Sequence, residues 1–179
     1  MTNKRKQREI IKERLSRMTK EERTGFSARI ADKLLSHPFY QEAKTIFIYY
    51  STEEEADTRF IVERALSSGK SVFLPRIEGE KMFPVPYCAG DDLQKDIYGI
   101  EEPLGEPYRG EIDLAVIPLL GYDKSRARLG RGKGYYDRFL SDFKGKSIAL
   151  AFSAQELPKV EIEASDVRPD RILTEKEEI

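Results

Sequence analysis

Cysteine, histidine and tryptophan are scarce in this sequence of 179 residues, which has one cysteine, one histidine and no tryptophan. The single cysteine, Cys88, excludes an intramolecular disulfide and a zinc cluster built on cysteines. It has no histidine near it in the sequence, so it is not predicted to be a nucleophile. His37 stands before Pro38 at the end of a predicted helix and is interpreted as a surface residue. The sequence therefore predicts no Ser-His-Asp or Cys-His arrangement.

Long apolar runs and an excess of one charge are also lacking. No run approaches the about 20 residues that a helix needs to span a bilayer, and the basic N-terminus lacks the apolar segment of a secretory signal. The formal net charge is -1 although 35% of the residues are charged, which argues against general adhesion to nucleic acid or to anionic membranes. We therefore expect a cytoplasmic protein that binds neither.

The hydrophobic pattern predicts one domain over residues 1–179. Thr19 with Glu22 three residues later is the signature of a capping box. The run 81–87 contains two prolines, so it is predicted to be an edge strand. The predicted helices are 3–17, 19–35, 59–68 and 135–142, and the predicted strands are 45–50, 71–75, 81–87, 113–119, 147–152 and 171–174.

This order of elements predicts an α/β fold, a three-layer α/β/α sandwich with a mostly parallel central sheet. Residues 89–110 are rich in glycine, proline and acidic residues and are predicted to be a long loop. In such folds ligands bind beyond the carboxyl ends of the strands. The segment that follows the strand 113–119 is therefore where a site is expected.

That segment contains the run Arg128-Leu-Gly-Arg-Gly-Lys-Gly-Tyr-Tyr-Asp137. Its three alternating glycines free the backbone, while Arg128, Arg131 and Lys133 add positive charge beside it. The run matches neither a Walker A loop nor a dinucleotide fingerprint. Its position between a strand and a helix nevertheless predicts a polyphosphate site, and Asp137 offers an oxygen ligand for Mg²⁺.

Other candidates lie far away in the sequence. Lys4 and Arg8 are one helical turn apart and could reach phosphates, although a solvated face is an ordinary alternative. Glu55 follows a strand, where a catalytic or substrate-binding carboxylate often lies, and an acidic helix entrance is equally compatible with it. Asp166 could complete a magnesium site with Asp137, as could Asp170. Tyr98 and Met82 could form an apolar wall for a flat ring, with packing in the core or the loop as the alternative.

Taken together, these residues resemble the 5-formyltetrahydrofolate cyclo-ligase family, also called methenyltetrahydrofolate synthetase. The run from Arg128 to Asp137 is highly specific to that family. The matching segments are Lys4 and Arg8, Glu55-Ala-Asp-Thr58, Leu74-Pro-Arg76, Gly99-Ile-Glu-Glu-Pro103, Pro118, Gly121-Tyr-Asp123, Arg128 to Asp137, Phe152, Gln155, Asp166 and Asp170.

The resemblance implies a reaction in which ATP and 5-formyltetrahydrofolate, with or without a polyglutamate tail, give 5,10-methenyltetrahydrofolate, ADP and phosphate with Mg²⁺. It implies that Arg131, Lys133 and Glu55 are catalytic, that Asp137 and Asp166 are linked to magnesium, and that the protein is a monomer. It implies a folate site formed by Glu55, Met82, Tyr98 and Phe152. It implies an ATP site formed by Lys4, Arg8, Arg128, Gly130, Arg131, Gly132, Lys133, Gly134, Tyr135, Tyr136 and Asp137.

The sequence departs from the family pattern at three positions. Arg126 stands where the pattern has glycine, Gln7 replaces the usual leucine, and Ile77 stands where some relatives carry an aromatic residue. Two other functions are alternatives. A different ATP-dependent phosphoryl transferase could use the same loop on another small acid, and ATP turnover without folate dependence would distinguish it. A nucleic-acid-binding module could use the basic first helix, and retention on RNA or DNA that falls with salt would distinguish that.

Overall fold

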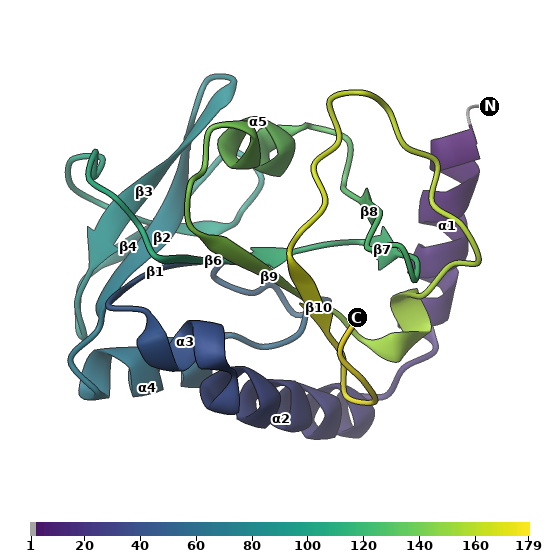
Figure 1. Cartoon of the computed structure of the whole chain (residues 1–179), viewed down its shortest axis with the longest axis horizontal. Coiled ribbons are helices and arrows are strands. Elements are labelled where there is room, and N and C mark those ends of the chain that lie inside the picture. The colour runs from purple at the N-terminus through teal and green to yellow at the C-terminus, as the bar shows by residue number, and fades with distance from the viewer. Residues whose placement is uncertain (1–2) are drawn as a thin grey trace.

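A six-stranded sheet forms the centre of the computed structural model, which describes residues 3–179 (Figure 1). The strand order is β10-β9-β6-β1-β2-β3, and every neighbouring pair is parallel except β2 with β3. This confirms the mostly parallel sheet and the position of 81–87 at its edge. The strands are β1 (Thr45–Ile48), β2 (Ser71–Glu78), β3 (Lys81–Tyr87), β6 (Leu114–Pro118), β9 (Lys146–Leu150) and β10 (Arg171–Leu173).

Helices cover both faces of the sheet. The larger layer consists of α2 (Lys20–Ser36), α3 (Pro38–Glu42) and α4 (Arg59–Ser67), whereas α5 (Tyr135–Ser141) lies on the opposite face (Figure 1). Each layer has its own core, because successive side chains of a strand point to opposite faces. Ile46 and Ile48 of β1 belong to the core under the larger layer, and Phe47 belongs to the core under α5. The three-layer α/β/α sandwich is confirmed.

The first helix lies outside these layers. The helix α1 (Asn3–Ser16) packs against the short 3₁₀ helix η1 (Ser153–Gln155) and against β7 (Gly121–Tyr122). Gln7, Ile11 and Leu15, spaced four residues apart, form its buried side. In the described part of the chain, no helix is long and apolar enough to cross a membrane.

The local signals at helix ends are partly confirmed. The Thr19 hydroxyl accepts a hydrogen bond from the Glu22 amide at 3.1 Å, and the Glu22 carboxylate accepts one from the Thr19 amide at 2.9 Å, which is the capping box. Pro38 ends α2 but also begins α3, which was not predicted. His37 joins the two helices and is buried. Its Nδ1 accepts a hydrogen bond from the Phe39 amide, and its Nε2 contacts Glu178. The interpretation of His37 as a surface residue was therefore wrong.

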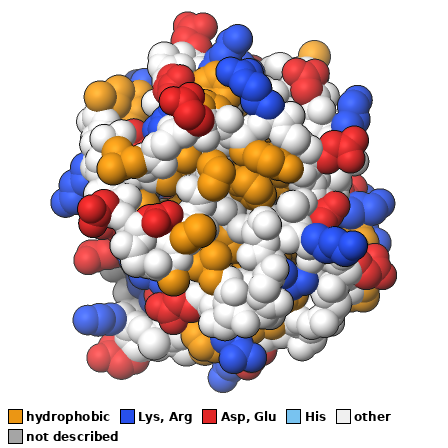
Figure 2. Space-filling view, turned by 90° about the vertical axis from the view of Figure 1, so that its left-hand side faces the viewer, with side chains coloured by type: hydrophobic (Ala, Val, Ile, Leu, Met, Phe, Trp, Pro, Cys, Tyr) orange, Lys and Arg blue, Asp and Glu red, His pale blue; other side chains and the backbone are white. Residues whose placement is uncertain are grey.

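The prediction of a structureless loop at 89–110 was also wrong. The strands β4 (Leu93–Lys95) and β5 (Glu101–Pro103) pair as an antiparallel hairpin. A second small ribbon pairs β7 with β8 (Arg128–Leu129), which is the beginning of the glycine-rich run Arg128 to Asp137. Beyond the hairpin, the Tyr108 amide donates a hydrogen bond to the Pro84 carbonyl at 2.7 Å and its ring stacks on Phe73. Figure 2, which faces the left-hand side of Figure 1, shows apolar side chains gathered in the middle of that side, between charged groups.

Candidate active site

A cleft of about 1000 Å³ opens beyond the carboxyl ends of β1 and β6. Tyr49 and Tyr50, which follow β1, and Leu119 and Leu120, which follow β6, form its floor. This is the position expected for a ligand in a parallel α/β sheet. The lining from α1 and the glycine-rich run consists mainly of cationic side chains and glycines and is called the cationic end, and the lining from β2, β3 and the β4–β5 hairpin is mostly apolar and is called the apolar end.

The glycine-rich run forms the wall of the cationic end. Gly132 and Gly134 have φ angles of +102° and +71°, which side chains rarely adopt, and Gly134 is the residue that caps α5. The Arg8 guanidinium donates a hydrogen bond to the Gly130 carbonyl at 2.9 Å. A Cβ added at Gly132 would lie 3.4 Å from that guanidinium. The positive φ of Gly132 therefore favours glycine at the place where Arg8, which lines the cleft, contacts the loop.

Two ion pairs hold the acids of this end. Arg128 donates to Asp137 at 2.6 Å, with the arginine side chain only 3% exposed, and Asp137 also accepts from the Val167 amide at 3.0 Å. Lys4 donates to Asp166 at 2.7 Å and lies 3.0 Å from Glu163. The predicted metal ligands Asp137 and Asp166 therefore line one cleft with the predicted phosphate contacts Lys4 and Arg128.

The Lys4 pair shifts both of its members. Burial acts to raise the pKa of Asp166, but the hydrogen bonds from Lys4 and from the Glu163 amide outweigh it, so this pKa is lowered. Burial acts to lower the pKa of Lys4, but the two carboxylates outweigh it and raise this pKa. Both groups are thus held in their charged forms.

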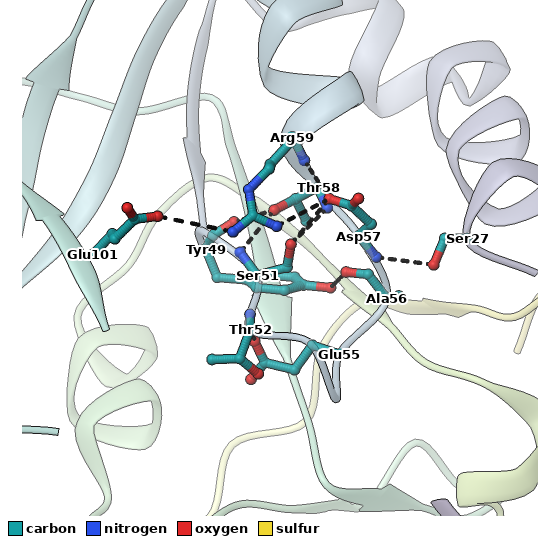
Figure 3. Close-up of polar contacts among 10 residues, drawn as sticks. All are labelled: Ser27, Tyr49, Ser51, Thr52, Glu55, Ala56, Asp57, Thr58, Arg59 and Glu101. Carbon is teal, nitrogen blue, oxygen red and sulfur yellow. Dashed lines mark hydrogen bonds and ion pairs between the residues drawn. The ribbon is translucent and has the colours of Figure 1, made fainter. Parts of the chain in front are cut away.

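Glu55 meets the glycine-rich run from the loop between β1 and α4. Its carboxylate accepts a hydrogen bond from the Thr52 amide at 2.9 Å and another from Arg131 at 3.3 Å (Figure 3 shows this loop). The side chain of Glu55 is 12% exposed and lines the cleft. Glu55 and Arg131, both predicted to be catalytic, are therefore in contact.

The loop that carries Glu55 is fixed by a polar network (Figure 3). The Thr58 hydroxyl donates to the Tyr49 carbonyl at 2.7 Å, and the Tyr49 hydroxyl donates to the Ala56 carbonyl at 2.7 Å. Asp57 accepts from the Ser51 hydroxyl and from the Arg59 amide, and it does not line the cleft. The network therefore directs Glu55, and not Asp57, toward the site.

The two tyrosines of the run also line the cleft. Burial, and then the negative charge of Glu55, raise the pKa of Tyr136 well above its ordinary range, so its phenol remains a neutral hydrogen-bond donor at neutral pH. Tyr135 donates to the Gly79 carbonyl at 3.2 Å. Lys133 lies 5.9 Å from the ring of Tyr98, so this lysine stands between the cationic end and the apolar end.

The apolar end combines β2, β3 and the β4–β5 hairpin. Met82 and Tyr98 line it, as predicted. Phe152 does not, because it follows β9 with its side chain turned to the core under α2, where it is fully buried and its ring centroid lies 6.4 Å from that of Phe26. The assignment of Phe152 to the folate site was therefore wrong. The apolar lining that the sequence did not single out includes Pro75, Ile77 and Ile100.

The sequence also missed Glu102, Glu163 and Val167, which line the cleft. Asp170 does not line the cleft, and its carboxylate instead accepts a hydrogen bond from the Ser147 amide at 2.8 Å. Among residues 3–179, no three acidic, histidine or cysteine side chains form a group that could bind a metal ion. A Mg²⁺ ion here would accordingly need oxygens from another molecule in addition to Asp137 and Asp166.

This chain is similar to known proteins in both sequence and fold. The model of the 5-formyltetrahydrofolate cyclo-ligase family matches residues 1–175. The mouse 5-formyltetrahydrofolate cyclo-ligase is 33% identical over 92% of this chain and 90% of its own length, and the Escherichia coli K12 protein of that name is 26% identical over 92% and 96%. The solved structure of Aquifex aeolicus 5,10-methenyltetrahydrofolate synthetase has a TM-score of 0.86 at 29% identity and covers 99% of this chain and 92% of that one. The chain belongs to the 5-formyltetrahydrofolate cyclo-ligase family and is an enzyme of the ligase class.

Proposed function

We propose that this protein converts 5-formyltetrahydrofolate and ATP into 5,10-methenyltetrahydrofolate, ADP and phosphate. The observation that carries the proposal is the contact between Arg131 and Glu55, which joins a cationic end suited to a triphosphate to an apolar end suited to a flat ring. The two substrates would meet at this contact. Phosphoryl transfer depends mainly on positioning and on charge neutralisation, and the cleft offers both.

The formyl oxygen is a poor leaving group, so the reaction needs to activate it. In the proposed first step this oxygen attacks the γ-phosphorus of ATP, the bond from that phosphorus to the β,γ-bridging oxygen breaks, and ADP leaves. In the second step the neighbouring folate nitrogen attacks the formyl carbon and loses its proton. The carbon–oxygen bond then breaks, phosphate departs, and the five-membered ring is closed.

The residues of the cationic end would act on the phosphates. Arg131 and Lys133 are exposed beside the glycine backbone, so their charges are available to oxygens in transfer. Lys4 and Arg8 approach the same wall from α1. Glu55 would contact the folate, since it is the more buried of the two acidic side chains, Glu54 and Glu55, that contact Arg131 from the β1–α4 loop.

The carboxylates of the cationic end fit a magnesium ion. Asp137 and Asp166 each use one oxygen in the contacts described above, and the other oxygen of each accepts no hydrogen bond from residues 3–179. Hard carboxylate oxygens are the ligands that Mg²⁺ prefers, and it commonly takes one or two of them with phosphate oxygens and water. The ion would neutralise charge on the phosphates of ATP.

The direct test is to incubate the purified protein with 5-formyltetrahydrofolate, ATP and Mg²⁺ and to follow the methenyl absorbance. We expect the initial rate of the rise in absorbance to be proportional to enzyme concentration, with one ADP formed per methenyl product. The absorbance should stay flat when ATP is omitted. A flat trace at high enzyme concentration with all components present would overturn the proposal. Turnover of ATP that does not depend on folate would point to another phosphoryl transferase.

A further inference from the structure

Glu102 is the feature of the cleft that the proposed chemistry leaves unused. It belongs to β5, lines the apolar end and is only 7% exposed. Its neighbours along this wall include Ile77, Met82 and Ile100. Burying a carboxylate in apolar surroundings is costly unless it is paired or well hydrogen-bonded.

The protein compensates this carboxylate only in part. One oxygen accepts a hydrogen bond from the Gln94 amide group at 3.1 Å, and the other accepts one from the Ile77 backbone amide at the long distance of 3.3 Å. Within residues 3–179, no cationic side chain forms an ion pair with it. An ionised carboxylate offers about four lone-pair sites, so about two acceptor positions remain for a ligand.

The adjacent residue shows how specific this arrangement is. Glu101 precedes Glu102 on β5 and points to the other face of the hairpin, as alternation along a strand requires. Its side chain is 42% exposed and lies 3.8 Å from Arg59 (Figure 3). Thus two consecutive glutamates have opposite environments, one exposed with a cation and one buried facing the cleft without a cation.

We propose that Glu102 binds the donor edge of the substrate's ring system. The ring system of a folate carries a 2-amino-4-oxopyrimidine, whose ring N–H and 2-amino group are adjacent donors on one edge. A carboxylate accepts two such parallel hydrogen bonds, which gives both affinity and orientation. The apolar side chains around Glu102 contact the ring faces, so this residue selects a 2-amino pyrimidine over a ring that lacks the amino group. The inference deepens the proposed function and rests on a folate being the substrate.

The test compares Glu102→Gln with Glu101→Gln as the matched control. We expect Glu102→Gln to raise the dissociation constant for 5-formyltetrahydrofolate, measured by calorimetry without ATP, by at least about tenfold, the effect of losing a hydrogen bond to a charged group. The KM for ATP should stay within about twofold of wild type, and Glu101→Gln should bind both substrates as wild type does.

A 2-desamino analogue of the folate separates recognition from a merely structural role. The wild-type protein should bind the analogue at least about tenfold more weakly than the parent, and Glu102→Gln should bind the two compounds nearly equally. A variant that weakens the parent and the analogue by the same factor would overturn the assignment, as would equal binding of both compounds by wild type. If wild type discriminates but no turnover occurs, the proposed reaction fails while Glu102 keeps its role. If turnover occurs but the variant binds as Glu101→Gln does, only the role of Glu102 fails.

Discussion

Arg128 has a structural role in addition to its proposed contact with phosphate, because a buried guanidinium needs a negatively charged partner. Asp137 supplies that partner at 2.6 Å, and the Nε of Arg128 has no hydrogen-bond partner within the described residues. Removing one member of a buried ion pair leaves a charge without compensation. Asp137 is therefore predicted to support the fold as well as the metal, whereas Lys133, which is exposed, is predicted to serve only the reaction.

We accordingly predict different outcomes for Asp137→Ala and Lys133→Ala. Asp137→Ala should lower the free energy of unfolding by about 2 to 3 kcal/mol, which is at or below the low end of the range for buried pairs because the aspartate is partly exposed. Lys133→Ala should change it by less than about 0.5 kcal/mol and should lower kcat/KM for ATP by about 10- to 100-fold. Urea unfolding and steady-state kinetics measure the two effects. Equal stability of the two variants would contradict the role given to Asp137.

Arg126 is the position at which the backbone departs from what its residue prefers. Its φ angle is +63°, and within residues 3–179 it is the only residue other than glycine with a positive φ. The resemblance led us to expect glycine here, and the positive φ gives that departure a physical consequence in the turn between β7 and β8. The buried Nε of Arg126 also lacks a hydrogen-bond partner among the described residues.

Replacing Arg126 by glycine should therefore stabilise the protein. The left-handed conformation costs about 1 to 2 kcal/mol for an L-residue, and glycine removes this cost. Glycine also raises the entropy of the unfolded chain, which destabilises the fold by about 0.5 to 1 kcal/mol. We therefore expect the free energy of unfolding to rise by about 0.5 to 1 kcal/mol. Arg126→Ala is the control, because it removes the side chain and keeps the strain. Thermal and urea unfolding should rank glycine above alanine, and the reverse order would show that the turn does not favour glycine.

At the scale of elements, the sequence predicted the strands of the main sheet because their apolar residues are consecutive. The strands β1, β6 and β9 are covered on both faces, so nearly every side chain of 46–48 and 114–117 is buried. The short elements α3, β4, β5, β7 and β8 were missed. Segments of two to five residues carry too little periodicity to be recognised. Such short elements depend on local contacts, such as the hydrogen bond that the Phe39 amide donates to His37 at the start of α3.

The part of the site whose residues are adjacent in the sequence was predictable, and the parts contributed by distant residues were less so. The glycine-rich run was found because it is continuous, whereas Lys4, Arg8 and Asp166 were only candidates on the sequence pattern and received their roles through the resemblance. Phe152 was misplaced because the resemblance gives no side-chain direction for a residue that follows β9. Glu102 was missed because it lies on β5, in a segment predicted to be a loop, where no alternation indicates which side chain faces the cleft.

Asp113 joins two strands at the end of the sheet opposite to the cleft. Its carboxylate accepts hydrogen bonds from the Lys44 and Thr45 amides at 2.8 and 3.0 Å. These bonds outweigh the effect of burial and lower the pKa of Asp113 below its ordinary value of 3.8. A lowered pKa means that the stabilisation is fully present above 3.8 and is lost as the pH falls through the folded-state value.

We predict that Asp113→Asn lowers the free energy of unfolding at pH 6 by about 1 kcal/mol, a small effect because the group is exposed. The difference from wild type should shrink as the pH falls below 3.8, since protonation removes the same interaction from wild type. Asp92→Asn is the control, because Asp92 is exposed and makes no hydrogen bond or ion pair within the described chain. Urea unfolding at a series of pH values measures this, and a difference that grows in acid would contradict the assignment.

At the scale of the whole molecule, the cationic end of the site forms where α1 meets a segment near the other end of the sequence. Helix α1 is joined to the segment 159–166 by Asn3 with Glu161 at 2.8 Å and by Lys4 with Asp166. Gln7 adds two contacts, since its amide group donates to the Lys159 carbonyl at 2.7 Å and its carbonyl accepts from the Glu161 amide at 3.3 Å. Gln7, where the resemblance led us to expect leucine, is therefore a link between α1 and the segment 159–161.

Gln7→Leu tests whether this link matters to the site. Gln7 is 8% exposed, so leucine retains the packing on α1 while removing both hydrogen bonds, at a cost of about 1 to 2 kcal/mol. Because Lys4 and Asp166 lie on the two segments that Gln7 joins, we expect the KM for ATP to rise several-fold, about the factor that 1 kcal/mol gives, with little change in the KM for folate. Hydrogen exchange at the Glu161 amide should accelerate. Faster exchange with an unchanged KM for ATP would mean that Lys4 and Asp166 hold the two segments together without Gln7, whereas a rise in both KM values would place the effect on the whole cleft.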